Sequence, residues 1–394
     1  MTRDDILGAS PAKPRLLYVV TEDWAFLSHR LPMARAARDA GFEVHVATRV
    51  SRGAAAIEAE RFTLHAIPFA RGSLSPLAAI ASIAALRRVR RDVKPELTHH
   101  VALQACVLGM LSTLGQPAAC INAFIGLGYS FTSETGKARV VRALIGLLLR
   151  FLINRRDCVA LVQNKDDRAE LVSLGVAQNR IALIPGSGVD VNHLTPIAEP
   201  NGAPTFGFVG RLLEDKGIRT LIAAHRLLRT RIPEARLLIA GTADPANPAS
   251  VTEAEAKSWN TEGGISWLGY VGDIADFWSK ANVAVLPSRR EGLPLSLLEA
   301  AACGRAMIAS NVPGCREIVI HEQTGLLFPV DNALALADAM GRLAADPRLR
   351  ARYAMAARKL VIERFTTDII GRQTVALYNR VIRKTLDADY SLLL

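Results

Sequence analysis

The 394-residue sequence predicts an α/β protein made of two doubly wound parallel sheets. Short runs rich in Val, Ile and Leu alternate with longer segments of helical period. This pattern restarts in the second half of the chain, after a stretch dense in turn residues. Half of the residues are hydrophobic and 22% are charged, which excludes a disordered or fibrous protein and allows a sizeable core in each half.

Each predicted strand is a short apolar run, and helical stretches lie between the runs. The first half contains six such runs, at residues 15–20, 43–48, 62–67, 96–100, 118–123 and 158–162. The second half contains five, at residues 205–209, 235–240, 265–268, 283–286 and 306–309. Open parallel sheets bind ligands at the carboxyl ends of their strands, so two sheets that face each other would form a cleft for two substrates.

The turn-rich stretch, residues 185–204, is expected to link two domains. We place the boundary near residue 195, with one domain over residues 14–194 and the other over residues 195–365. The last segment, residues 366–394, has helical period as far as Lys384, and we expect it to complete the first domain.

The net charge of +11 is concentrated in one region. Residues 84–156 contain eleven Lys and Arg against three Asp and Glu, which predicts a positive surface on the first domain. Such a surface can meet nucleic acid, anionic lipid or an anionic substrate, and charge alone does not choose among them.

Cysteine spacing and hydropathy narrow the class of protein. The five cysteines are scattered, with neither a disulfide framework nor zinc-ligand spacing. The apolar run at residues 143–149 is too short to span a membrane, and the first thirteen residues do not resemble a secretory signal. We therefore expect a cytoplasmic protein.

The segment REGLPLSLLEAAACG, residues 290–304, follows a predicted strand and starts a helix. Glu291 lies in the loop, and Glu299 lies on the helix that we expect to begin near Pro294. The first-turn N–H groups have no intrahelical partners and, with the helix dipole, form an anion site that suits a diphosphate. An ordinary helix start with solvated glutamates would give the same pattern.

The segment FVGRLLEDKG, residues 208–217, connects the first strand of the second domain to its first helix. Arg211 and Lys216 both follow the carboxyl end of that strand. An Arg fork and a Lys point charge can neutralise two phosphates of a leaving nucleotide diphosphate. A solvated basic loop is the alternative explanation.

These two segments, with SNVPGCREIVIHEQTGLLFP, resemble the donor-binding domain of family 4 retaining glycosyltransferases, which have the GT-B fold of two Rossmann-like domains. In the first half, TEDWAFLSHRLPMARAARDAG, HHVALQACVLG and INAFIGLGYSF resemble the subgroup that assembles bacterial surface polysaccharides and glycans on a polyprenyl-diphosphate carrier. The resemblance implies an N-terminal acceptor domain and a C-terminal nucleotide-sugar domain. The implied reaction moves an N-acetylhexosamine or hexose, from a donor expected to be UDP-linked, to a lipid-linked saccharide.

The resemblance also implies roles for single residues. Glu299 would bind the donor ribose and Glu291 the donor sugar. A family histidine near the fourth strand corresponds to His100, with His99 as the second choice, because strand alternation sends the two to opposite faces. The residues expected to act in catalysis are Glu291, His100, Lys216 and Arg211. The residues expected to bind the donor are Arg211, Lys216, Gly292, Leu293, Pro294, Leu295 and Glu299.

Acceptor binding is assigned to the first domain. The candidate residues are Glu22, His29, Arg30, Gly126 and Gly128, of which Arg30 suits an acceptor diphosphate. A solvated helix start at residues 22–30 and a plain glycine turn at residues 126–128 would give the same sequence pattern. Family members of this kind usually need no metal, and no Asp-x-Asp cluster ends a predicted strand, so we expect neither a metal nor another cofactor.

Residues 137–156, KARVVRALIGLLLRFLINRR, combine six basic residues with a broad apolar face and no acid. Such a helix can lie on an anionic bilayer, where the enzyme would meet a lipid-linked acceptor on the inner face of the bacterial plasma membrane. A core helix with basic ends is the alternative.

Two other functions are compatible with parts of the sequence. A nucleotide-sugar epimerase has the same two-lobe architecture but lacks this Glu spacing. A basic module that binds nucleic acid or lipid would suit the positive region. However, we find no nucleic-acid-binding motif, and aromatics make up only 6% of the chain, so we expect no nucleic-acid partner.

Overall fold

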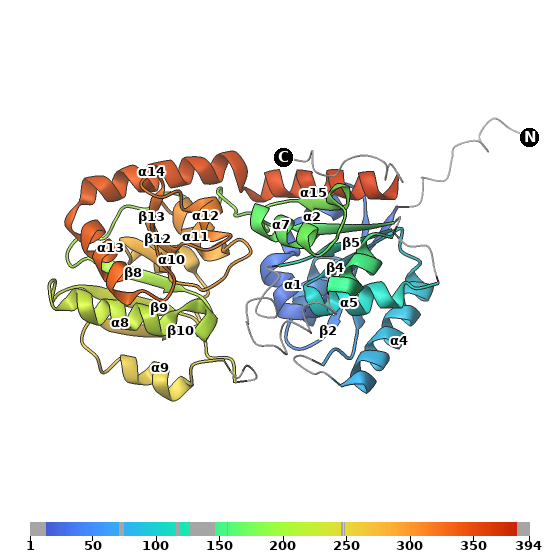
Figure 1. Ribbon diagram of the computed structural model, residues 1–394, viewed down its shortest axis with the longest axis horizontal. Coiled ribbons are helices and arrows are strands. Elements are labelled where there is room, and N and C mark those ends of the chain that lie inside the picture. The colour runs from blue at the N-terminus through green and yellow to red at the C-terminus, as the bar shows by residue number, and fades with distance from the viewer. Residues whose placement is uncertain are drawn as a thin grey trace, which may run out of the picture. The chain divides into compact units, whose positions relative to one another are not determined.

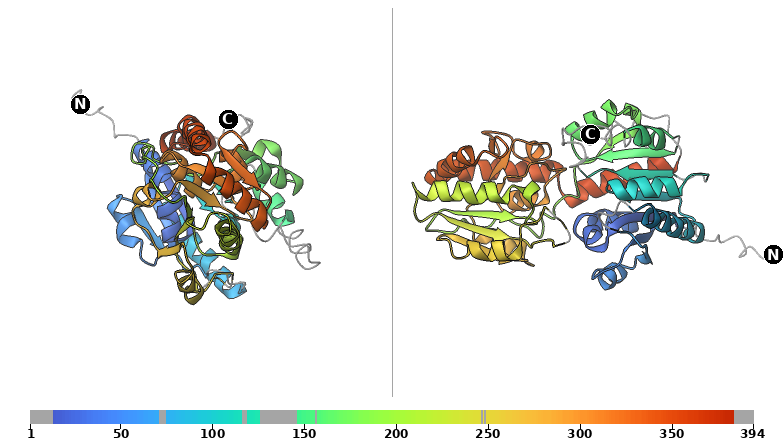
Figure 2. Two further views of the ribbon diagram at one scale, coloured as in Figure 1. Left: turned by 90° about the vertical axis from the view of Figure 1, so that its left-hand side faces the viewer. Right: turned by 60° about the horizontal axis from the view of Figure 1, so that its bottom comes forward.

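The computed structural model describes residues 13–70, 75–115, 119–125, 146–155, 157–245, 247 and 249–383. The chain divides into two units (Figures 1 and 2). Unit 1 comprises Met1–Ser187 with Ile370–Leu394, and unit 2 comprises Gly188–Ile369. Unit 2 begins at Gly188, a few residues before the expected domain boundary near residue 195, because Val189 is already hydrogen-bonded to the segment that follows α14 (Pro347–Arg364). Its N–H donates to the Phe365 carbonyl oxygen over 2.9 Å, and its own carbonyl accepts from Thr367 over 3.1 Å.

Unit 1 contains a seven-stranded sheet in the order β3-β2-β1-β4-β5-β6-β7, in which every neighbouring pair is parallel. Its strands are β1 (Arg15–Glu22), β2 (Glu43–Arg49), β3 (Thr63–Ala66), β4 (Leu97–Val101), β5 (Ala119–Ala123), β6 (Cys158–Val162) and β7 (Ile181–Leu183). Its helices are α1 (Asp23–His29), α2 (Leu31–Asp39), α3 (Ala54–Ala59), α4 (Pro76–Val93), α5 (Leu103–Ser112), a helix over residues 146–153, α7 (Lys165–Ser173), the 3₁₀ turn η2 (Gln178–Arg180) and α15 (Thr367–Ile382).

Unit 2 contains a six-stranded parallel sheet in the order β10-β9-β8-β11-β12-β13. Its strands are β8 (Thr205–Val209), β9 (Arg236–Ala240), β10 (Ile265–Gly269), β11 (Val283–Leu286), β12 (Ala306–Ser310) and β13 (Gly325–Phe328). Its helical segments are the 3₁₀ turn η3 (Glu214–Lys216), α8 (Ile218–Arg229), α9 (Glu253–Trp259), α10 (Ile274–Ser279), α11 (Leu295–Ala302), α12 (Cys315–Ile318), α13 (Ala333–Ala345) and α14 (Pro347–Arg364).

All eleven strands expected from the sequence are present, and β7 and β13 add one more at the edge of each sheet. In each unit the strand order reverses beside the first strand, at β1/β4 and at β8/β11. Ligands of open α/β sheets bind at such a point, outside the carboxyl ends of the strands. The loops after β8 and β11 and the end of β1 therefore locate the candidate sites.

The C-terminal helix α15 packs on the sheet of unit 1. Its Ile370, Leu377 and Tyr378 are fully buried in one hydrophobic cluster with residues of β1 and β4. The hydroxyl of Tyr378 lies 2.6 Å from the Tyr18 hydroxyl on β1 and 2.6 Å from Nδ1 of His99 on β4. Apolar burial and a buried hydrogen-bonded chain together fix the helix on this face of the sheet.

Candidate active site

Two loops of unit 2 meet because a glycine allows backbone to contact backbone. Gly217, between η3 and α8, has φ of +67°, and a Cβ built on it would overlap the carbonyl oxygen of Pro287 after β11. Only glycine adopts this conformation without strain and leaves room for that oxygen. The contact brings Lys216, at the end of η3, next to the loop that carries Glu291.

Lys216 and Glu291 form a partly buried ion pair. The Lys216 Nζ lies 2.6 Å from Glu291 Oε1, and the Ser288 hydroxyl donates to the same oxygen over 2.6 Å. The Ser310 hydroxyl at the end of β12 donates in turn to the Ser288 carbonyl. The carboxylate of Glu291 is therefore held in one orientation by residues that follow three neighbouring strands.

Helix α11 begins at Leu295, with Pro294 as its N-cap residue and no side chain capping the first turn. Gly292 and Pro294 are buried, and Leu293 and Leu295 are partly buried. Below this loop Gly314 has φ of +76°, and a Cβ on it would overlap the Gly292 carbonyl oxygen, so the loop is packed against the backbone that follows β12. The result is a supported helix N-terminus of the kind that binds phosphate.

Glu299 lies on α11, one turn beyond the helix start, and is partly buried. Within the described part of the chain its carboxylate has no hydrogen bond or ion pair, and desolvation raises its pKa to about 8. A desolvated carboxyl group without a partner is stabilised when a ligand donates hydrogen bonds to it, for example from two neighbouring hydroxyls.

Arg211 follows β8, and its Nη1 lies 3.4 Å from Oδ2 of Asp244, in the loop after β9. Its guanidinium is the more exposed of the two basic groups predicted for the diphosphate. Sequence reasoning did not include Ser288 and Asp244, which orient Glu291 and Arg211. The position of Ser288 three residues before Glu291 was the available signal, whereas nothing local to Arg211 indicated Asp244.

In unit 1, His99 and His100 lie on opposite faces of β4, as strand alternation predicts, but both side chains are fully buried. The His100 Nδ1 lies 2.8 Å from the Asn122 amide oxygen, and a Cβ on Gly109 of α5 would overlap its ring. His99 is stacked on Tyr18 beneath α15. This burial contradicts the expectation that His100 reaches a substrate, because helices cover both faces of the strand.

Arg30 is also misplaced for the role predicted from the sequence. It is 2% exposed, its Nη1 lies 3.4 Å from the Met33 sulfur, and its Nε has no hydrogen-bond partner among the described residues. It therefore lies in the core of unit 1 rather than at a surface where an acceptor diphosphate could reach it, which contradicts the expected contact. His29, by contrast, is exposed at the end of α1.

The other acceptor candidates are placed in different ways. Glu22 ends β1, is buried, and is paired with Arg49. Gly126 and Gly128 lie outside the described residues, as does half of the predicted membrane segment 137–156, of which residues 146–155 are described. In that part Leu147 and Phe151 are both 65% exposed and line a cavity with Arg150 and Arg155.

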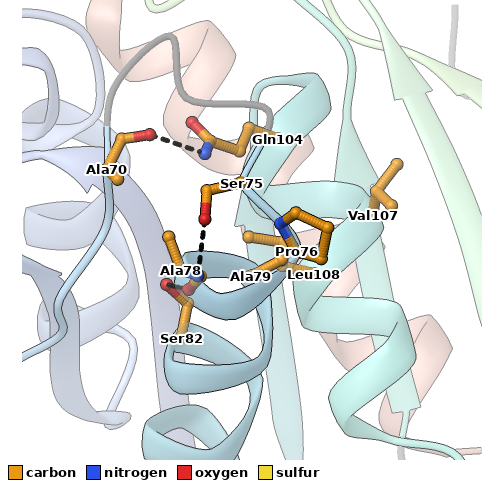
Figure 3. Close-up of a pocket in the computed structure, with 9 residues that line it drawn as sticks. All are labelled: Ala70, Ser75, Pro76, Ala78, Ala79, Ser82, Gln104, Val107 and Leu108. Carbon is orange, nitrogen blue, oxygen red and sulfur yellow. Dashed lines mark hydrogen bonds between the residues drawn. The ribbon is translucent and has the colours of Figure 1, made fainter.

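A second cavity in unit 1 lies between the starts of α4 and α5 (Figure 3). Its walls are apolar or hydroxyl-bearing, and Gln104 donates to the Ala70 carbonyl oxygen over 3.1 Å at one side. The described lining holds no charged side chain, so this cavity does not suit a diphosphate.

Across the described residues, no cluster of three or more His, Cys, Asp or Glu could hold a metal ion. None of the described helices has the length and hydropathy needed to cross a bilayer.

Two family models match the chain, one in each unit. The model described as "Glycosyl transferases group 1" matches residues 203–346, and the model described as "Glycosyl transferase 4-like" matches residues 15–164. Each unit therefore carries a glycosyltransferase domain, of the 4-like model in the first half and of the group 1 model in the second. These matches confirm the transferase class, and the epimerase and the basic binding module are set aside.

Relatives in sequence agree with these matches, and solved structures show the same fold. Over 380 residues the glycosyltransferase is 25% identical to the N,N'-diacetylbacillosaminyl-diphospho-undecaprenol alpha-1,3-N-acetylgalactosaminyltransferase of Campylobacter jejuni, covering 91% of this chain and 98% of the relative. The structure of sucrose-phosphate synthase from Thermosynechococcus elongatus matches with a TM-score of 0.78 and 22% identity, covering 94% of this chain and all of that one. HepE from Anabaena, in complex with UDP-glucose, matches with a TM-score of 0.76 and 17% identity, covering 93% and 99%. The expected GT-B fold is confirmed.

Proposed function

We propose that the enzyme transfers a hexose or N-acetylhexosamine, with retention at the anomeric carbon, from a UDP-sugar to a lipid-linked saccharide. The Lys216–Glu291–Ser288 cluster beside the start of α11 carries this proposal. The C. jejuni relative is named for a diphospho-undecaprenol acceptor, and HepE binds UDP-glucose, which supports the choice of acceptor class and nucleotide.

The donor diphosphate is assigned to unit 2. Lys216 and Arg211 would bind its phosphates together with the backbone N–H groups at the start of α11, from Gly292 to Leu295. When the bond to the sugar breaks, negative charge grows on the diphosphate. These groups therefore stabilise the transition state more than the ground state. Glu299 would accept hydrogen bonds from the ribose hydroxyls.

Glu291 would contact the donor sugar on the side where positive charge develops. Its carboxylate is already oriented by Lys216 and Ser288, so little reorganisation is needed when the sugar becomes oxocarbenium-like. The cationic side chains would meet the charge of the leaving group without a metal ion, and activity is expected to persist in EDTA.

Membrane contact is assigned to the helix over residues 146–153. Leu147 and Phe151 are exposed apolar side chains, and Arg150 and Arg155 line the same cavity as both of them. Apolar side chains that insert at the interface, next to cations that meet anionic headgroups, are typical of peripheral membrane helices. The enzyme would thus act as a peripheral protein on the inner face of the plasma membrane. Co-sedimentation with phosphatidylglycerol vesicles should be weaker for Phe151→Glu than for wild type, and equal binding would contradict this assignment.

The test of the reaction is UDP release from UDP-N-acetylglucosamine, UDP-N-acetylgalactosamine and UDP-glucose in EDTA, with and without an undecaprenyl-diphosphate-linked N-acetylhexosamine. One donor should show acceptor-stimulated release. Lys216→Ala should lower kcat/KM by about 10²-fold or more, as loss of one charge-stabilising contact does. Arg219→Ala, which removes a basic group of α8 paired with Glu255, is the control. No release from any nucleotide-sugar, or a Lys216→Ala variant as active as the control, would overturn the proposal.

A further inference from the structure

The loop that carries Glu291 has ties besides those that orient its carboxylate. Arg289 follows β11, directly after Ser288 and two residues before Glu291. Its backbone N–H donates to the Asp215 carbonyl oxygen of η3 over 2.8 Å, and its side chain is paired with Asp331, in the loop after β13. One residue of this loop is thus bonded to segments that follow two other strands.

The Arg289–Asp331 pair crosses the end of β12. Because β12 lies between β11 and β13 in the sheet, the two loops start two strand spacings apart, or roughly 10 Å. The long arginine side chain bridges this distance, and its Nε lies 3.0 Å and 2.9 Å from the two carboxylate oxygens of Asp331. The pair therefore ties the loop after β11 to the far side of β12.

The backbone at Asp331 would suit glycine better. Its φ is +58°, in the left-handed region where a Cβ costs free energy, although aspartate tolerates this region better than most residues. The Thr220 hydroxyl, in the first turn of α8, lies 3.4 Å from the same carboxylate, and the dipole at a helix N-terminus favours negative charge. A carboxylate kept at such a position indicates that its side chain is used.

Global stability is a poor explanation for the pair. Both side chains are 44% exposed, and pairs open to solvent add little to the free energy of unfolding. Position matters more, because a shift of about 1 Å in a group at the reacting centre can lower the rate by about 10²-fold. Without the pair, the loop that carries Glu291 would lose its tie to β13.

We propose that Arg289 and Asp331 are positioning residues that hold the Glu291 carboxylate in the orientation needed for transfer. Asp331 acts through Arg289 and the loop after β11, and neither side chain needs to touch the substrate. This inference rests on the proposed role of Glu291 at the donor sugar. It adds the loop after β13 to the parts of unit 2 on which the reaction depends.

The test compares Asp331→Gly, Asp331→Asn and Arg289→Gln in steady-state transfer with the donors and acceptor named above. Glycine suits the backbone and removes the carboxylate, whereas asparagine keeps one acceptor oxygen. Asp331→Gly and Arg289→Gln should each lower kcat by about threefold to tenfold, Asp331→Asn by less, and Asp331→Gly with Arg289→Gln by no more than the stronger single change. The donor KM should stay within about twofold of wild type, and Tm within about 4 °C.

Glu262→Gln is the matched control, because Glu262 and Arg226 form another exposed pair of unit 2, at 2.6 Å, and its kcat should equal that of wild type. In a Glu291→Ala background, Asp331→Gly should cost no further activity, since the carboxylate that it positions is gone. Hydrogen–deuterium exchange of residues 287–293 needs no turnover. It should be faster in Asp331→Gly than in Glu262→Gln.

A kcat of Asp331→Gly equal to that of Glu262→Gln would overturn the positioning role. A loss of kcat that persists in full in the Glu291→Ala background would overturn it too, because the effect would then not pass through Glu291. A wild type that transfers nothing, with faster loop exchange in Asp331→Gly, would refute the reaction and leave the hold of the pair on the loop standing. Unchanged exchange in such a case would refute both.

Discussion

Replacing Glu299 by Gln is expected to stabilise the ligand-free enzyme at neutral pH and to remove its response to UDP. Burial raises the pKa of Glu299 to about 8 from an ordinary value of 4.5. The folded chain therefore holds this proton more tightly than the unfolded chain does. Ionisation of Glu299 accordingly lowers the free energy of unfolding as the pH rises from about 4.5 to about 8.

The magnitude follows from the two pKa values. With about 8 in the folded chain and 4.5 in the unfolded chain, Glu299 lowers the free energy of unfolding by about 3 kcal/mol at pH 7 and by about 1 kcal/mol at pH 5. Gln keeps the shape of the protonated acid and does not ionise. The Glu299→Gln variant should thus be more stable than wild type at pH 7, and the difference should shrink by about 2 kcal/mol at pH 5.

The assay is urea unfolding at pH 5 and pH 7, followed by tryptophan fluorescence, because Trp259, Trp267 and Trp278 all lie in unit 2 with Glu299. Glu234→Gln, an exposed site of the same unit, is the control and should change stability by less than about 0.5 kcal/mol. Addition of UDP at about 100 times its Kd should stabilise wild type by about 2.7 kcal/mol. The Glu299→Gln variant should be stabilised by much less, because Gln offers one acceptor oxygen, whereas Glu299 ionised by the bound ribose hydroxyls offers two.

Two results would refute the reasoning about Glu299. A Glu299→Gln variant no more stable than wild type at pH 7, or a stability difference that is the same at pH 5 and pH 7, would show that its carboxyl group is not kept protonated by burial. A variant stabilised by UDP as strongly as wild type would show that Glu299 does not bind the ribose.

Two further predictions concern the packing that supports the sites. Gly217→Ala should destabilise the enzyme by about 1–3 kcal/mol and lower transfer, because the new Cβ strains a left-handed residue and displaces the loop after β11. Gly341→Ala, in α13 with room for a Cβ, should stabilise by about 0.5–1 kcal/mol, and thermal unfolding of both variants checks the contrast. Tyr378→Phe should lower the free energy of unfolding by about 1–3 kcal/mol, because it leaves two buried polar partners unpaired, whereas the exposed Tyr270→Phe should change it by less than about 0.5 kcal/mol in urea titrations.

The sequence predicted the sheets well because buried parallel strands are continuous apolar runs, whichever helices cover them. The two strands that it did not predict are sheet edges with weak local signals. β7 has three residues, and β13 begins at Gly325. Neither is distinguishable from a loop until a neighbouring strand pairs with it.

The placement of a site residue could be predicted where it depends on the residue's own segment. It could not be predicted where it depends on other elements that pack over the residue. The position of Lys216 in the connection between β8 and α8 followed from its own segment. The burial of His100 could not be predicted from its own segment, because Gly109 of α5 packs against its ring. Arg30 is likewise buried, and it interacts electrostatically with Tyr378 of α15, which comes from the far end of the sequence. Strand alternation predicts the face of the sheet to which a side chain points, but not which helix packs on that face.

The ion pair between Lys216 and Glu291 explains how unit 2 can hold both charges needed for the proposed reaction before a substrate binds. A partly buried ammonium group is stabilised by a carboxylate, and its three N–H donors allow it to keep that carboxylate while binding a phosphate oxygen. As the bond to the sugar breaks, the diphosphate becomes more negative and the sugar more positive. In the proposed reaction Lys216 would then gain interaction with the leaving group, and Glu291, fixed by Ser288, would gain interaction with the sugar. Because each charge holds the other in place, removing either would weaken both interactions.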